Sequence, residues 1–383
     1  MKESIIIKNL GPLKDISIEE IKPFTVFIGE SGSGKSTLMK VISLFRYIYK
    51  MQNIYSYLKI SNVNIPFVFE KDIYSYFENC GIKEFIKTNT EIVYKISFDE
   101  VIKYEIKFKT GFGLSTSQQT INASDLSFNK ISFISETRNI IPLWANVGAS
   151  LTGGNLGFYF HEVFKDFNLA SDSIKDIDLK HLGLKFSVKK SNLGKNYRIE
   201  SNNNENFDIE FKNSSSGTQT SVPILLISQF FTQNFKFEDA FNSSVLKYLS
   251  STDSLTEFKA VKNLSDLNKK IYIHIEEPEL SLFPDAQCKL IDDLVNNCFI
   301  NNTNPTELLL STHSPYIVNY LNLLIKRFDK NIGEAKYNYD ELAVYQVADG
   351  QLINLMAQNE RLVNTNPLSD TINDIYNEYE KLG

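Results

Sequence analysis

Residues 24–37 read FTVFIGESGSGKST, and this stretch decides the fold. The apolar run at 24–28 predicts a short buried strand, and the apolar residues after the glycines recur at helical spacing and predict a helix over 37–49. Between them lies the pattern GxxxxGK[ST], in the strand–loop–helix order that a phosphate-binding loop requires. The stretch therefore predicts an α/β protein that binds a nucleotide. The competing interpretation is a glycine-rich turn that carries a solvated lysine.

The residue types of this loop suit a phosphate group. Gly29 and Gly34 permit the backbone angles of a loop wrapped round an anion, and Gly32 lets the main chain approach closely. Backbone amides and the helix N-terminus then face the phosphates. We expect Lys35 to reach the β- and γ-phosphates and the Ser36 hydroxyl to bind Mg²⁺. The residues predicted to bind the nucleotide are Gly29, Glu30, Ser31, Gly32, Ser33, Gly34, Lys35, Ser36 and Thr37.

The composition is that of a folded protein. Of 383 residues, 42% are hydrophobic and 13% aromatic, which is enough for a buried core. The net charge of −6 argues against a wholly basic nucleic-acid coat protein. The three cysteines lack metal-ligand spacing, and their odd number suits a reducing compartment. There is neither a signal-peptide pattern nor a run of 18 apolar residues, so we expect a cytoplasmic protein without a membrane span.

Strands and helices alternate along the rest of the chain. Buried strands are predicted at 271–275 and 308–310, each followed by a helical pattern, and residues 91–109 alternate like a hairpin. This order favours a mostly parallel sheet covered on both sides. The tyrosine- and phenylalanine-rich region at 55–86 favours helices packed on the core. No sustained heptad repeat occurs, so a long coiled coil is not expected.

Polar residues follow two of the predicted buried strands. Ligands bind at the carboxyl ends of strands in α/β sheets, and there Glu276 is a plausible Mg²⁺ partner, directly or through water. Glu277 is placed to polarise an attacking water, although an acidic loop that caps the next helix is the alternative. His313 follows the other strand and is expected to sense the γ-phosphate, whereas a lone histidine is often structural. His274 lies inside a strand and is expected in the core.

These motifs together resemble a known family. The phosphate-binding loop, SSSGTQ at 214–219, EEPE at 276–279 and THS at 312–314 occur in the order of ATP-binding-cassette (ABC) ATPases. The pieces NLGPLKD, EEPELSLFP and STHSPYIVN look like the soluble group that includes OLD-family, RecF-like and SMC-like proteins. Within it, the sequence is most similar to the short ATPases described as AAA-domain proteins. The resemblance covers most of the chain and is weakest between about 55 and 210.

The resemblance implies an α/β fold: one ABC-type ATPase head over 1–383, with a phosphate-loop mixed sheet flanked by helices, an antiparallel β part and a helical insert. The nucleotide-binding core would comprise about 1–54 and 207–383, and an inserted helical and β lobe about 55–206, including a Q-loop-like segment at 131–139. Two heads would dimerise head to tail and hold each ATP between the phosphate-binding loop of one and the signature segment of the other. The implied site residues beyond the loop are Ser215, Ser216 and Gly217 (signature), Glu277 (attacking water), Glu276 (magnesium), His313 (switch) and Arg138, which lies where the subgroup has a Pro-Ala-Glu-Arg segment.

The activity implied by the resemblance is Mg²⁺-dependent ATP hydrolysis by a homodimer, or by a higher oligomer of dimers. Such a protein would be the sensor or scaffold that controls a separately encoded nuclease or toxin effector in prokaryotic anti-phage defence. The chain itself is not expected to be a nuclease, because only 70 residues follow His313 (383 − 313) and they hold no acidic cluster of the Toprim type.

Two other functions compete with this one. The first is a DNA-repair or chromosome-maintenance clamp of RecF or SMC type, in which nucleic acid would contact the basic run within 180–198. A solvated basic face is the simpler interpretation of that run. The second is the nucleotide-binding subunit of a transporter, against which the absence of a standard LSGGQ signature argues.

Overall fold

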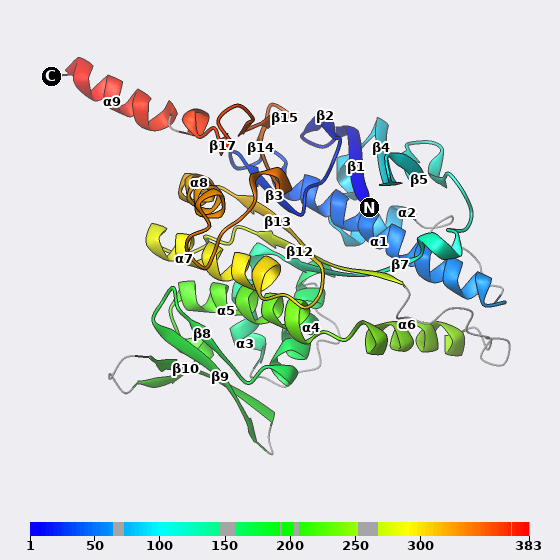
Figure 1. The fold of residues 1–383 in the computed structure, drawn as a ribbon, viewed down its shortest axis with the longest axis horizontal. Helices are drawn as coiled ribbons and strands as arrows, with labels where there is room; N and C mark the ends of the chain where they lie inside the picture. Colours follow the sequence, from blue (N-terminus) through cyan, green and yellow to red (C-terminus); the bar gives the residue numbers. More distant parts are fainter. Residues whose placement is uncertain are drawn as a thin grey trace.

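The computed structural model describes residues 1–63, 73–145, 158–191, 194–202, 207–251, 267–368 and 370–382. A six-stranded mixed sheet forms its centre (Figure 1). From one edge to the other its strands are β15 (Gln351–Asn354), β14 (Leu342–Ala348), β3 (Phe24–Ile28), β13 (Thr306–Thr312), β12 (Asn268–Glu276) and β7 (Ser127–Ile134). Every neighbouring pair is parallel except β14 with β15. The carboxyl ends of β3, β12 and β13 therefore meet at one edge, where Glu276 pairs with Ser311.

Helices cover both faces of this sheet. Figure 1 shows α1 (Lys35–Ile60) on one side and α5 (Ser216–Gln229) with α7 (Pro284–Val295) on the other. Because the central strands are covered on both faces, their side chains are largely buried, and every residue of β3 and of β13 is buried. The other helices are α2 (Ile73–Asn79), α3 (Ile141–Ala145), α4 (Phe158–Ser173), α6 (Phe237–Ser251), α8 (Pro315–Lys330) and α9 (Asp370–Leu382).

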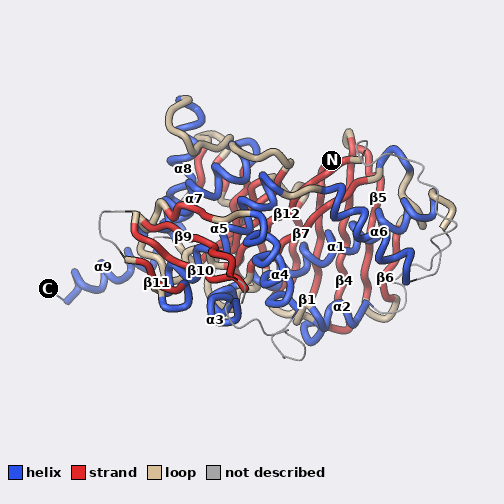
Figure 2. The backbone as a smooth tube through the Cα atoms, turned by 90° about the horizontal axis from the view of Figure 1, so that it is seen from below, coloured by secondary structure: helices blue, strands red, loops and turns tan. Residues whose placement is uncertain are grey.

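Two antiparallel sheets lie at opposite ends of the molecule (Figure 2). The first has the order β2 (Leu13–Ile18), β1 (Lys2–Leu10), β4 (Ile86–Phe98), β5 (Val101–Lys109) and β6 (Gly113–Thr116). The second has the order β11 (Asp208–Glu210), β10 (Gly194–Ser201), β9 (Leu184–Ser191) and β8 (Asp176–Leu179). A two-stranded pair, β16 (Met356–Ala357) with β17 (Leu362–Val363), completes the list. The hairpin predicted at 91–109 is β4–β5.

The predicted fold class is confirmed, but the pairing of strands crosses the predicted lobe boundaries. β4, β5 and β6 lie within 55–206, yet they form one sheet with β1 and β2. β7 also lies within that range, and it is an edge strand of the central sheet. The segments 1–54 and 207–383 therefore do not build the core alone. The physical reason is that β1 and β12 have backbone groups on one side that only strands from the middle of the chain satisfy.

Among the described residues, no helix is both long enough and apolar enough to cross a membrane. The longest helix there, α1, has 26 residues and packs across the central sheet, so the described part holds no coiled-coil arm. The predicted helical region at 55–86 includes the end of α1 and α2, while 64–72 lie outside the described residues. The terminal helix α9 stands off from the body (Figure 1), and Tyr379 on it is 73% exposed.

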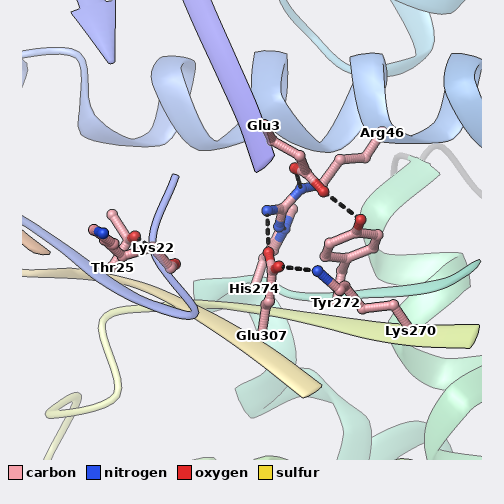
Figure 3. Close-up of polar contacts among 8 residues, drawn as sticks. All are labelled: Glu3, Lys22, Thr25, Arg46, Lys270, Tyr272, His274 and Glu307. Atoms are coloured by element: carbon pink, nitrogen blue, oxygen red, sulfur yellow. Dashed lines mark hydrogen bonds and ion pairs between the residues drawn. The ribbon is translucent and has the colours of Figure 1, made fainter. Parts of the chain in front are cut away.

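A buried ionic network joins α1 to the central sheet (Figure 3). The Arg46 guanidinium donates to Glu3 at 2.7 Å and to Glu307 at 2.6 Å, and one of its nitrogens lies 2.9 Å from Nε2 of His274. Lys270 also bonds Glu307, at 2.5 Å, and the Tyr272 hydroxyl bonds Glu3. Two carboxylates thus balance one guanidinium and one ammonium, which offsets much of the cost of burying them. His274 is in the core, as predicted, and burial beside Arg46 holds its pKa well below its usual range.

Candidate functional site

The phosphate-binding loop between β3 and α1 is built on close backbone contacts. Gly32 and Gly34 have φ angles of 79° and 107°, in the region that favours glycine. A Cβ atom on Gly34 would lie 2.7 Å from Cδ2 of Leu13, and one on Gly29 would lie 2.5 Å from the carbonyl oxygen of Val347. The loop is therefore packed between the first sheet and β14.

Lys35 is folded into this loop. Its Nζ donates to the carbonyl oxygens of Gly29 and Glu30, both at 2.8 Å. Burial lowers the pKa of Lys35, and the nearby carboxylates of Glu277 and Glu279 oppose the shift. The ammonium thus lies inside the loop and interacts electrostatically with Glu277 and Glu279, in the turn that follows β12.

Glu276 ends β12 with its carboxylate buried. The side chain is 1% exposed, and neither carboxylate oxygen has a hydrogen-bond partner within the described ranges. Burial raises the pKa of Glu276 to about 8 and Glu136 adds to the shift, while Lys40 and the Ser36 hydroxyl act against it. An unpartnered carboxylate beside a hydroxyl of the phosphate-binding loop suits Mg²⁺, which prefers oxygen ligands and takes phosphate oxygens and water for the rest. The described residues hold no cluster of three or more His, Cys, Asp or Glu side chains suited to a metal, so bound phosphate would have to complete the coordination.

Glu277 and His313 lie together at the ends of β12 and β13. Oε1 of Glu277 is 3.3 Å from Nε2 of His313, and both side chains are about one-third exposed. Glu277 has a left-handed backbone with φ of 45°, and its amide donates to the Ser311 carbonyl at 2.8 Å. The His313 amide donates to the Glu279 carboxylate at 2.6 Å. A positive φ is uncommon for a residue with a side chain, and such residues cluster at functional sites.

Ser215 and Ser216 lie exposed at the start of α5. Ser215 is the N-cap residue of this helix, and its hydroxyl accepts from the Thr218 amide at 3.4 Å. Gly217 is buried against the turn that follows β12, where an added Cβ would lie 2.8 Å from the Ser281 carbonyl oxygen. Two exposed serines thus lie at the N-terminus of a 14-residue helix, an arrangement that suits an anion.

Arg138 is not placed as the resemblance implied. The guanidinium is fully buried and donates to the main-chain carbonyls of Ser135, Thr220, Glu276 and Glu277. Burial lowers the pKa of Arg138 to about 10, and nearby carboxylates oppose the shift. Four of its N–H groups are therefore engaged inside the protein. The implied contact with the nucleotide thus remains a prediction, and in this conformation the guanidinium bonds main-chain carbonyls instead.

One of two comparisons with known proteins agrees with an ATPase. Residues 160–318 are similar to the family described as AAA ATPase domain, a match of 159 residues (318 − 160 + 1) out of 383. A crystal structure of the SmcHead bound to the C-winged helix domain of ScpA matches at 10% identity, with a TM-score of 0.43, over 93% of this chain and 98% of that one. The latter likeness is too weak to support any inference. No curated protein matches the sequence.

The matched region contains Ser215, Glu276, Glu277 and His313, whereas the phosphate-binding loop lies outside it. The loop was found from its own sequence pattern, and the two observations support ATP binding and hydrolysis independently. The sequence analysis missed Glu136, which acts on Glu276. A signal for it exists, because Glu136 follows β7 just as Glu276 ends the neighbouring strand β12.

Proposed function

We propose that the chain is a Mg²⁺-dependent ATPase in which Glu277 orients the attacking water. The observation that carries this proposal is the Glu277–His313 pair, 3.3 Å apart, at the edge of the sheet where Lys35 and the phosphate-binding loop also lie. The loop amides and Lys35 bind the phosphates and hold the terminal one in line with Glu277. Ser36 and Glu276 would hold Mg²⁺, which would neutralise phosphate charge. His313 fixes the Glu277 carboxylate and donates towards the γ-phosphate.

The site is proposed to be completed by a second copy of the chain. Ser215 and Ser216 are exposed at the N-terminus of α5, while Gly217 and Thr220 are held by the turn that follows β12. In this arrangement the two serines are available to a nucleotide bound by another subunit. ATP binding is then also the event that assembles the dimer, or a higher oligomer of dimers.

Replacing Glu277 with glutamine tests this function. The amide keeps the size of the side chain but is not a base, so we expect turnover to fall by about 100-fold or more. Binding of a fluorescent ATP analogue remains, and ATP shifts the variant to a dimer in size-exclusion chromatography with light scattering. Glu84→Gln, an exposed carboxylate next to the first sheet, is the matched control and keeps the wild-type rate. Hydrolysis by Glu277→Gln at the wild-type rate contradicts the assignment.

Within the same proposal, the ATPase is the sensor or scaffold that controls a separately encoded nuclease or toxin in prokaryotic anti-phage defence. The support is the resemblance of the motifs, together with α9, which offers exposed apolar side chains away from the nucleotide site. The genes that flank this one test the role. A neighbouring nuclease or toxin gene is expected, and a neighbouring permease gene contradicts the proposal.

The DNA clamp is the second candidate, and the same ATPase head would serve it equally well. Basic side chains of β9 and β10 have acidic neighbours: Lys189 lies 2.9 Å from Glu200, and Arg198 lies 2.7 Å from Asp208. This pairing favours a solvated face over a phosphate-binding surface, although exposed pairs are weak. Tight DNA binding that falls steeply with salt, and that is lost on mutation of Lys189 and Arg198, would favour the clamp.

A further inference from the structure

Arg138 connects three segments whose main chains meet behind the site. Its Nε donates to Thr220 at 3.0 Å, and Nη1 donates to Ser135 at 3.0 Å and to Glu276 at 2.7 Å. Nη2 donates to the carbonyl of Glu277 at 2.5 Å. Four of the five N–H groups of the planar fork are therefore used, all on main-chain oxygens. A fully buried guanidinium without a carboxylate bonded to it is costly to desolvate, so the arrangement calls for an explanation.

The start of α5 and the turn that follows β12 form one unit. The Thr220 hydroxyl donates to the Leu280 carbonyl at 2.9 Å. The main chain of Gly217 packs so closely on Ser281 that an added Cβ would lie 2.8 Å from its carbonyl oxygen. The turn between Glu277 and Ser281 therefore has little room to move independently of the first turn of α5.

We propose that Arg138 is a positioning residue that ties the first turn of α5 to the main chain of Glu277. This inference rests on the proposed function, in which Ser215 and Ser216 contact the nucleotide of a second subunit. When that contact fixes the first turn of α5, Arg138 holds the Glu277 backbone in its left-handed conformation and so orients the carboxylate towards water. The signature segment of a subunit thereby controls hydrolysis in the same subunit.

If Arg138 is a positioning residue, its replacement should slow turnover without weakening ATP binding. Arg138 lies behind the Glu276–Glu277 main chain, whereas the phosphate-binding loop is built on β3 and α1. We expect Arg138→Gln to lower kcat by about 10-fold or more while the Kd for ATP changes by less than about 3-fold. Arg138→Lys keeps the charge but not the fork, so an intermediate kcat is expected.

A double-mutant cycle on the full-length protein tests the connection to Glu277. Single-turnover hydrolysis is measured for the wild type, Arg138→Gln, Glu277→Gln and the double variant. If Arg138 acts through Glu277, the double variant is no slower than Glu277→Gln alone. Arg327→Gln is the control, because Arg327 is also an arginine that joins elements: from α8 it donates to the Asp292 carboxylate on α7 and to the Ala335 carbonyl. Its Tm is expected to fall without a change in kcat.

The outcomes separate this inference from the proposed function. A wild-type protein that does not hydrolyse ATP overturns both. An active wild type with unchanged kcat in Arg138→Gln, or with additive losses in the double variant, overturns the role of Arg138 alone. Equal losses of ATP binding and turnover in Arg138→Gln mean a purely structural role and also overturn it. If Arg138→Gln does not fold, Arg138→Lys decides, and a wild-type kcat in that variant contradicts the proposal.

Discussion

At the residue scale, Arg46 shows how one side chain fixes several elements at once. Its partners Glu3, His274 and Glu307 are separated from it in sequence by 43, 228 and 261 residues. No local sequence pattern predicts this ionic network, because in the sequence Arg46 is simply a charged residue on a predicted helix. The network is therefore visible only in three dimensions.

Removal of Arg46 is expected to destabilise the whole protein. Arg46→Met keeps much of the side-chain volume but leaves two buried carboxylates without their main counter-charge. We expect a loss of about 3–5 kcal/mol in the free energy of unfolding, measured by urea denaturation. Lys2→Met removes a cation from the exposed Lys2–Glu100 pair and is the control, with no measurable change expected. Equal midpoints for the two variants contradict the importance of the network.

The site residues divide into those that sequence reasoning finds and those that it does not. The positions of Glu277 and His313 followed from one rule, because parallel strands with aligned ends bring their following residues together. The burial of Arg138 was not predicted, because a motif says which residue is present, whereas burial depends on how the chain turns after β7. Identification of Glu136 as a site residue would have required the knowledge that β7 lies beside β12.

At the element scale, α1 extends 11 residues beyond its predicted end, from residue 49 to Ile60. The second half of the helix carries polar residues among its apolar and aromatic ones, and Gln52, Asn53 and Ser56 are buried. Gln52 donates to the Gln119 carbonyl at 2.6 Å, Asn53 accepts from the Ser127 amide at 2.7 Å, and Ser56 accepts from the Ile121 amide at 2.8 Å. These side chains satisfy the main chain that leads into β7, so hydrophobic periodicity alone underestimates the helix.

The phosphate-binding loop offers a matched pair of glycine substitutions. Gly32 and Gly34 both have positive φ, but a Cβ on Gly32 would meet open space, whereas one on Gly34 would meet Leu13 and Pro12. Gly32→Ala should lower the free energy of unfolding only through the strain of a left-handed backbone on alanine, by about 1–2 kcal/mol. Gly34→Ala adds the clash, so its Tm without nucleotide is expected to fall further. The same Tm for both variants would show that Leu13 moves aside without cost.

At the scale of the whole molecule, the order of strands and helices predicted the class of the central sheet correctly. It did not predict the pairing of strands, because strands from the middle of the chain complete sheets that the two ends begin. Sequence order therefore establishes which elements exist more securely than which elements pair.

The exposed position of α9, away from the body of the protein, leads to a prediction about truncation. Ile375, Tyr376 and Tyr379 are each more than 60% exposed, so they contribute little to the packed body. We expect a chain that ends at Leu368 to keep its Tm within about 2 °C and to keep its ATPase rate, because little buried apolar area is lost. Differential scanning calorimetry measures the first quantity. A clear drop in Tm would mean that α9 packs against the body in solution.

The position of β3 in the central sheet has a consequence for protein synthesis. β3 leaves the ribosome early, but its two neighbours in the sheet are β13 and β14, which are made late. Gly29 packs against the Val347 carbonyl, and the Lys14 amide donates to the Gly350 carbonyl, so both contacts join residues more than 300 positions apart. Contacts so distant along the chain form slowly. A nascent chain therefore carries the phosphate-binding sequence without its packed loop until β13 and β14 have also been made.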